Sequence, residues 1–191
     1  MERDELKSII ESLLFVADGP QTLHRFGEIF DQADRQTLQA VLSELQTEYE
    51  SQNRGIRLVE VAGGYQLRTA KIHADWIKKF LGGRPARMGK ATLETLAIVA
   101  YRHPITRAEV EAIRGVDVDG VMTTLLDRNL IRAVARKDVP GRPFLYGTTP
   151  EFLQLFNLKD LSELPALKET EDLALREVPG ENLPIDHLEE S

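Results

Sequence analysis

The chain contains no cysteine and no long apolar segment. Without cysteine, disulfides, thiolate zinc sites, iron–sulfur clusters and cysteine nucleophiles are excluded, and the composition fits a reducing compartment. The longest apolar stretch, Leu96 to Tyr101, is far shorter than the roughly 20 residues of a membrane-spanning helix. The first residues, MERDELKSII, are acidic and amphipathic and do not resemble a secretory signal. We therefore expect a soluble, cytoplasmic protein.

Charge is unevenly distributed along the 191 residues, although the formal net charge is only −7. Residues 83–150 hold 11 basic and 7 acidic residues, whereas residues 165–191 hold 2 basic and 8 acidic residues. The latter segment also contains three prolines and no aromatic residue, so it cannot bury enough apolar surface to offset its chain entropy. We expect an acidic, disordered tail over 165–191.

A pattern of three helices recurs at a spacing of about 80 residues. ESLLFVA, which begins at Glu11, is similar to ETLAIVA, which begins at Glu94, at an offset of 83. Thr22 and Thr106 then stand where each second helix needs an N-cap. The third helix repeats an i, i+3, i+4, i+7 apolar stripe at an offset of 80. The matched positions are Leu38, Val41, Leu42 and Leu45 against Val118, Val121, Met122 and Leu125.

The hydrophobic period changes after each third helix. β-branched and aromatic residues around glycine turns predict β-hairpins over 56–69 and 131–148, each followed by an amphipathic helix. We therefore predict a mainly α fold with small β-hairpins (α+β), built as tandem winged helix-turn-helix domains. Two unrelated helical bundles with surface ribbons are the less specific alternative. The expected parts are an N-terminal domain (1–82), a linker (83–90), a C-terminal domain (91–164) and the tail (165–191).

No pattern in the sequence supports catalysis or cofactor binding. The linker departs from a phosphate-binding loop, because Arg84 stands at the first glycine position and Ala91 stands where the hydroxyl belongs. The four histidines lie far apart, and none shows the pairing of a zinc helix. We expect no enzymatic activity, no cofactor and no metal ion.

The acidic residues of the second unit are expected to have structural roles or to be solvated. A calcium loop is unsupported because Leu126 occupies the position of its bidentate carboxylate, so we expect Asp117 or Asp119 to cap the third helix. Glu109 and Glu111 point to different faces of one helix, and we expect both to be solvated surface residues.

The third helix of the second unit argues against sequence-specific DNA recognition. A DNA-reading helix needs Arg, Lys, Asn or Gln near its N-terminus, where this sequence has Asp117 and Asp119. The following hairpin carries a basic cluster that could contact phosphates weakly, with an ordinary solvated loop as the alternative. The cluster consists of Arg132, Arg136, Lys137 and Arg142.

Long stretches of the chain resemble the bacterial segregation and condensation protein B family. The resemblance is carried by ATLETLAIVAYRHPITRAEVEAIRGV (91–116) and LLDRNLIRAVARKDVPGRPFLYGTTPEFLQLFNLKDLSELP (125–165), and by ESLLFVADGP and GGYQLRT in the first half. It covers about residues 4–166. Val118 departs from the family pattern, which has a small polar residue before the aspartate, and this change affects only the cap.

The resemblance implies a non-catalytic subunit of the prokaryotic SMC condensin complex, acting in chromosome condensation and partition during the cell cycle and cell division. Its partners would be the kleisin, segregation and condensation protein A, and through it an SMC ATPase at the nucleoid. The N-terminal winged helices would form a homodimer, and the C-terminal ones would bind the kleisin. A tandem winged-helix transcriptional regulator that binds DNA without a partner is the alternative.

Particular residues follow from these expectations. Residues 1–80 carry more apolar surface than such a unit comfortably buries, which favours a dimer. The residues concerned are Leu13, Leu14, Phe15, Phe30, Trp76 and Phe80. The kleisin is expected to contact Tyr146, Phe152, Leu153 and Phe156, unless these complete the core. That core is expected to contain Leu93, Leu96, Val110, Ile113, Val121 and Leu125.

Overall fold

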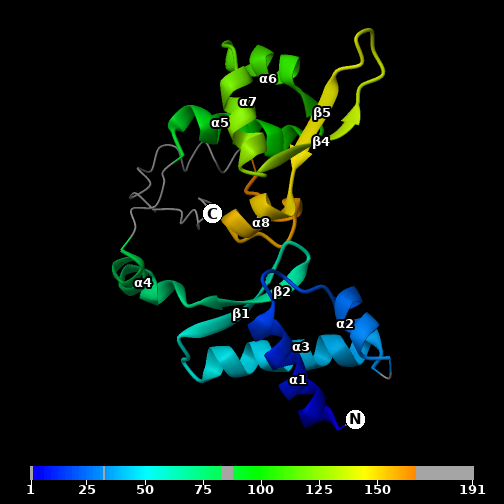
Figure 1. Cartoon of the computed structure of the whole chain (residues 1–191), viewed down its shortest axis with the longest axis vertical. Helices are drawn as coiled ribbons and strands as arrows, with labels where there is room; N and C mark the ends of the chain where they lie inside the picture. The colour runs from blue at the N-terminus through cyan, green and yellow to red at the C-terminus, as the bar shows by residue number, and fades with distance from the viewer. Residues whose placement is uncertain (1, 32, 83–87, 167–191) are drawn as a thin grey trace. The chain divides into compact units, whose positions relative to one another are not determined.

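The computed structural model describes residues 2–31, 33–82 and 88–166, and the chain divides into two compact units (Figure 1). Unit 1 comprises Met1–Arg84 and unit 2 comprises Pro85–Ser191, so the division falls within the stretch expected to be a linker. Most of that linker, and nearly all of the expected tail, lie outside the described residues. Across the described ranges, no helix combines the length and apolar character needed to cross a membrane.

Unit 1 consists of three helices, a hairpin and a short trailing helix. These elements are α1 (Arg3–Val16), α2 (Leu23–Ile29), α3 (Arg35–Ser51), β1 (Ile56–Val61), β2 (Gly64–Thr69), the 3₁₀ turn η1 (Lys71–His73) and α4 (Ala74–Leu81). The predicted N-cap of α2 is confirmed, because Thr22 Oγ1 accepts a hydrogen bond from the Arg25 backbone N–H at 3.1 Å. The apolar stripe of α3 is buried together with α1, α2 and the hairpin in one core.

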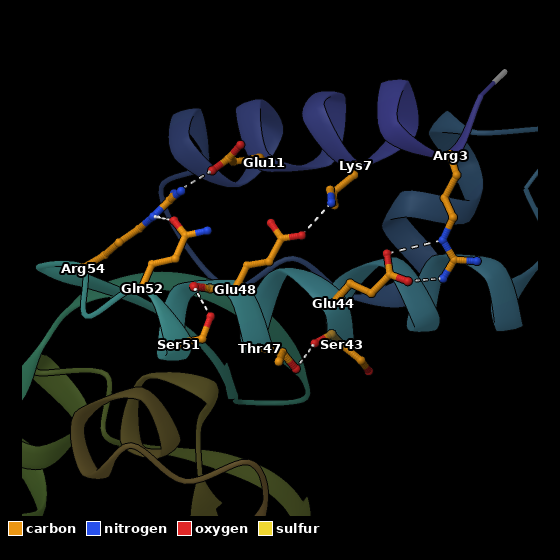
Figure 2. A network of polar contacts seen from close by, with 10 residues as sticks. All are labelled: Arg3, Lys7, Glu11, Ser43, Glu44, Thr47, Glu48, Ser51, Gln52 and Arg54. Atoms are coloured by element: carbon orange, nitrogen blue, oxygen red, sulfur yellow. Dashed lines mark hydrogen bonds and ion pairs between the residues drawn. The ribbon is translucent and has the colours of Figure 1, made fainter.

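A ladder of ion pairs joins α1 to α3 on the outside of unit 1 (Figure 2). Arg3 contacts Glu44 at 2.5 Å, and Lys7, one turn later, contacts Glu48 at 2.6 Å. The hydrogen bond to Glu48 raises the pKa of Lys7 above its usual value. Exposed pairs of this kind each contribute little to stability, so the apolar core beneath them carries the fold.

Unit 2 repeats the order of elements and adds a short strand. It contains α5 (Lys90–Arg102), β3 (Ile105–Thr106), α6 (Arg107–Arg114), α7 (Asp119–Asp127), β4 (Ile131–Arg136), β5 (Phe144–Thr148), α8 (Pro150–Phe156) and the 3₁₀ turn η2 (Leu161–Glu163). Its antiparallel sheet has the order β3-β5-β4, with Ile105 paired to Tyr146. Unit 1 has an equivalent isolated bridge between Gln21 and Tyr65. The described residues are therefore mainly helical with two small sheets, as predicted for the fold class.

The structural repeat differs from the sequence repeat in the first helix. Buried positions Ile10 and Leu14 of α1 correspond to Leu96 and Ala100 of α5, and the helix ends Val16 and Arg102 agree with this pairing. This offset is 86, so the alignment at an offset of 83 was wrong for this helix by almost one turn. Five residues separate the end of α1 from the cap Thr22, but only three separate the end of α5 from the cap Thr106. The similarity of the two sequence segments concealed this difference in loop length.

The core of unit 2 lacks two of its predicted members. Leu96, Val110 and Leu125 are buried as expected, and Val121 packs against them. Leu93 and Ile113 are exposed, because each lies on the side of its helix that faces away from the core of unit 2.

Candidate interaction surfaces

The functional candidates in this chain are surfaces. Within residues 2–31, 33–82 and 88–166, no three acidic or histidine side chains come together in a way that could hold a metal ion. The described surface includes a hollow along α3 and another between α5 and α6. Exposed apolar residues and the distribution of charge distinguish the surfaces that could bind a partner.

Helix α4 carries an apolar face that unit 1 does not cover. Trp76 and Phe80 of α4, together with Ile72 of the preceding turn η1, are spaced four residues apart and are 70%, 89% and 81% exposed. No residue of α4 itself is buried, so this helix is held to unit 1 by little apolar contact. We call these three residues the α4 face. Exposed apolar surface of this kind makes the α4 face a candidate interaction surface.

The structure divides the apolar residues expected in a dimer interface into two groups. Leu14 and Phe30 are buried in the core of unit 1, and Leu13 packs against it. Phe15, at the end of α1, is exposed like Trp76 and Phe80. Half of the expected set therefore stabilises the unit itself, and the other half is available to a partner.

Strand β5 and helix α8 place the four expected kleisin-binding residues at different depths. Thr149 Oγ1 caps the helix by accepting a hydrogen bond from the Phe152 backbone N–H at 3.2 Å, and Pro150 follows at the first helical position. Phe152 is 2% exposed and belongs to the core of unit 2. Tyr146, Leu153 and Phe156 are half-buried and pack against the edge of that core. The Phe156 ring lies 4.9 Å from the Phe152 ring.

The basic cluster of the second hairpin is divided by a β-bulge between Ala133 and Ala135. Arg132 pairs with Gly147, whereas Arg136 pairs with Phe144, three residues away along the partner strand. Because side chains alternate along a strand, the bulge places the two arginines on opposite faces of the hairpin.

Arg136 and Lys137 of the basic cluster are each held by neighbouring residues. The Arg136 guanidinium lies 3.9 Å from the centre of the Phe144 ring and donates a hydrogen bond to the Arg142 carbonyl at 3.0 Å. Lys137 Nζ contacts Glu109 Oε1 at 2.6 Å. The four cations therefore do not form one continuous phosphate-binding surface.

Glu109 has a structural role that the sequence interpretation missed. Its carboxylate accepts hydrogen bonds from the Thr106 backbone N–H and hydroxyl, at 2.9 and 2.7 Å, in a capping box that begins α6. Together with Lys137, these bonds lower its pKa from 4.5 to about 2. The predicted cap at Thr106 is confirmed, whereas the description of Glu109 as mere solvated surface was wrong. Glu111 contacts Arg107 at 3.6 Å.

The start of α7 is acidic, and one of its two carboxylates pairs with a cation of unit 2. Asp117 Oδ1 accepts a hydrogen bond from the Asp119 backbone N–H at 3.1 Å, although the N-cap residue itself is Val118. The Asp119 carboxylate pairs with Arg107 of α6. This turn therefore presents carboxylates where a DNA-reading helix needs hydrogen-bond donors to base edges.

A second apolar surface in unit 2 lies between α5 and α6. It is lined by Glu94, Ala97, Ile98, Ile113, Arg114 and Val116, and we call it the α5–α6 groove. Arg114 crosses one end, where Nη1 donates hydrogen bonds to Glu94 at 2.5 Å and to the Ala91 carbonyl at 3.2 Å. Sequence reasoning missed this groove because it assigned Ile113 to the core.

The sequence is similar to known proteins along most of its length. Residues 8–167 match the family described as segregation and condensation complex subunit ScpB. Segregation and condensation protein B of Syntrophotalea carbinolica is 51% identical over 173 residues, which cover 91% of this chain and 87% of that protein. The protein of the same name from Moorella thermoacetica is 47% identical over 168 residues, covering 87% of this chain and 85% of the relative.

Solved structures with similar sequences include ScpB from Mycobacterium tuberculosis. That chain is 38% identical, with a TM-score of 0.41 and coverage of 83% of this chain and 98% of the other. A dimer of an ScpB N-terminal domain complexed with an ScpA peptide is 35% identical, with a TM-score of 0.38, and covers 40% of this chain and 95% of that domain. The family match, which extends through both units, is decisive: this chain belongs to the segregation and condensation complex subunit ScpB family.

Proposed function

We propose that this chain is a non-catalytic subunit of the prokaryotic SMC condensin complex, located in the cytoplasm at the nucleoid. In this role it binds the kleisin, ScpA, and through it an SMC ATPase, and it regulates chromosome condensation and segregation during cell division. The observation that carries the proposal is the family match over residues 8–167, which includes both units and their exposed apolar surfaces. We retain the proposed division into an N-terminal domain (1–82), a linker (83–90), a C-terminal domain (91–164) and an acidic tail (165–191).

We interpret both units as winged helix-turn-helix domains. Each has three helices followed by a hairpin, and in each a residue before the second helix pairs with the second hairpin strand. The pairs are Gln21 with Tyr65 and Ile105 with Tyr146. Such a third strand is what connects a wing to the helices in this fold, and it supports the interpretation independently of the helix order.

We assign homodimerisation to unit 1, with the α4 face as its central contact. Large apolar side chains in the middle of an interface contribute most of its binding free energy, and Trp76 and Phe80 are of this type. Their exposure in the single chain is unfavourable in water, and a second copy would remove it. The polar residues of α4, among them Asp75 and Lys79, would then form the rim.

We assign kleisin binding to the edge of unit 2 formed by Tyr146, Leu153 and Phe156. These side chains are half-buried, so a partner can cover what remains exposed while the core keeps them in place. Phe152 lies beneath them and would act by supporting Phe156 rather than by touching the kleisin. Preorganised aromatic side chains of this kind bind with little loss of conformational entropy.

A DNA-binding transcriptional regulator is not favoured. The acidic first turn of α7 lacks donors for base edges, and the basic cluster is divided between two hairpin faces. Weak DNA contact through Arg132, Arg136, Lys137 and Arg142 remains part of the proposal, without sequence preference.

The assignment of the kleisin surface is tested by coprecipitation with the cognate ScpA. Leu153→Glu and Phe156→Glu in the full chain should reduce the retained kleisin at least tenfold, because a charge would be buried in the interface. Thr123→Glu, an exposed substitution on α7, is the matched control and should retain it. Thermal unfolding of each variant separates loss of binding from loss of fold.

The same experiment has to include unit 1. The ScpA peptide in the solved complex described above is bound to a dimer of N-terminal domains, so Trp76→Glu is tested alongside. If Trp76→Glu abolishes kleisin binding while folded Leu153→Glu and Phe156→Glu chains bind normally, the kleisin site belongs to unit 1 and our assignment is wrong.

A further inference from the structure

The α5–α6 groove is an apolar surface that the described part of the chain leaves open. Ile113 and Val116 on its α6 side are 53% and 55% exposed. Ala97, on the α5 side, is exposed as well, and Ile98 is half-buried. Apolar side chains in this arrangement favour an occupant that removes them from water. The groove is separate from the surface that we assign to the kleisin, which involves no residue of α5 or α6.

The described chain ends beside this groove. The Tyr101 hydroxyl donates a hydrogen bond to the Pro165 carbonyl at 2.8 Å, which attaches the last described residues to α5. Tyr101 is three residues from Ile98 and four from Ala97, so all three side chains share one face of the helix. One helical turn, about 5.4 Å along the axis, separates the attachment point from the groove.

The residues that follow have the composition of a suitable occupant. The span from Ala166 to Leu173 can extend over about 23 Å, which is enough to reach along the whole of the groove from its starting point. Lys90 and Arg114 both pair with the single carboxylate of Glu94, so one positive charge remains beside the groove, and it is complementary to the acidic residues that follow Ala166. Residues 167–178 contain the apolar residues Leu167, Leu173, Ala174, Leu175 and Val178, the acidic residues Glu169, Glu171, Asp172 and Glu177, and the basic residues Lys168 and Arg176.

We propose that residues 167–178 dock in the α5–α6 groove of the same chain, with their leucines against Ile113 and Val116. The inference rests on the position of Pro165 on Tyr101, on the apolar lining of the groove and on the charge of the segment. The acidic C-terminal segment is then a resident occupant of unit 2. Any protein that uses this groove has to displace the segment first.

Methyl NMR of the full chain provides the test, because isoleucine δ1 resonances report on the groove without altering it. Spectra of the full chain are compared with those of a chain that ends after Ala166, which retains every core residue of both units. We expect the Ile98 and Ile113 resonances to differ between the two chains. Ile10 and Ile131, which are buried away from the groove, should not move.

Paired substitutions assign the effect to the segment. Leu173→Ser with Leu175→Ser should shift the Ile98 and Ile113 resonances to the positions seen in the shortened chain. Leu183→Ser with Leu188→Ser, farther along the sequence, should leave them at the positions of the full chain. Identical resonances in the full and shortened chains overturn the proposal. A difference that appears only as protein concentration rises also overturns it, because the occupant is then a second copy.

Discussion

Lys137, the residue that follows β4, contacts Glu109 of α6 at 2.6 Å and so ties the second hairpin to the helix that precedes it. The same carboxylate closes the capping box of α6 through Thr106. One side chain thereby begins a helix and orients a hairpin, and it does so as an anion. This explains why its pKa is lowered from 4.5 to about 2.

Loss of the Glu109 carboxylate should destabilise unit 2. Glu109→Ala removes both the cap and the ion pair, and we expect a loss of about 1 kcal/mol in unfolding free energy at neutral pH. Glu109→Gln keeps a hydrogen-bonding side chain at the capping position and loses only the charge, so its effect should be smaller. Thermal unfolding measures both, with Glu111→Gln as the control that leaves the cap intact.

The contribution of Glu109 should depend on pH in a defined direction. Because the folded-state pKa is below the ordinary value of 4.5, the stabilisation is complete above that pH and is lost as pH falls toward 2. The stability difference between the wild-type chain and Glu109→Gln should therefore shrink between pH 5 and 2. A difference that stays constant over this range would show that the charge has no part in it.

Removal of the Thr95 hydroxyl should stabilise unit 2. Thr95 is fully buried in α5, and its Oγ1 has no hydrogen-bond partner among the described residues. The Ala91 carbonyl, one turn earlier, accepts from Arg114 instead. Thr95→Val should therefore raise the unfolding free energy by about 1 kcal/mol. The same substitution at Thr106 should lower it by a similar amount, because Thr106 is a cap.

Gly64 of β2 and Gly147 of β5 should differ in their tolerance of alanine. A Cβ on Gly64 would lie 2.9 Å from the Gln21 backbone, which cannot move without breaking its bridge to Tyr65. A Cβ on Gly147 would meet the His103 ring, whose Nδ1 accepts a hydrogen bond from the Thr148 backbone N–H. We expect Gly64→Ala to cost more than Gly147→Ala, since a ring can turn away more easily than backbone.

Gly120 provides the control for both glycine variants. It lies in α7, and a Cβ there would meet nothing within 4 Å, so Gly120→Ala should raise the unfolding free energy by as much as about 1 kcal/mol. Chemical denaturation ranks the three variants. Equal stability of Gly64→Ala and the wild-type chain would contradict the close approach of Gln21.

Charge on the α4 face should separate the proposed dimer into monomers. Trp76→Glu and Phe80→Glu place carboxylates where apolar side chains would meet. Neither residue is buried in the single chain, so both variants should fold, with a melting temperature lowered only by the loss of dimerisation. Sedimentation equilibrium at tens of micromolar distinguishes the two states. The control is Lys71→Glu, an exposed substitution in η1, and this variant should remain dimeric. A wild-type chain that is monomeric at this concentration would refute the proposed dimer.

The predictable parts of the fold were those determined by neighbours along the chain. The apolar stripes of α3 and α7 and the caps at Thr22 and Thr106 depend on residues within one helical turn, so the sequence pattern was sufficient. Strand β3 was missed because two residues cannot show a periodic pattern, and its existence depends on β5.

Burial was less predictable because it depends on which elements meet. Phe152 and Phe156 share one apolar pattern on α8, yet the packing of unit 2 buries the first and leaves the second at the edge. Ile113 has the spacing of a core residue, but α6 places it outside. The division of the basic cluster was equally hidden, since the bulge after Ala133 is a property of strand pairing rather than of composition.

The central claim is that this chain binds the kleisin and does not act as a DNA-binding regulator. The most direct measurement is a calorimetric titration of the full chain with the cognate ScpA, beside a titration with duplex DNA, at ~0.15 M ionic strength. We predict saturable binding of ScpA at micromolar or lower concentrations, and weak DNA binding without sequence preference that disappears as salt is raised. The absence of heat with ScpA, together with nanomolar affinity for one DNA sequence over scrambled DNA, would contradict the account.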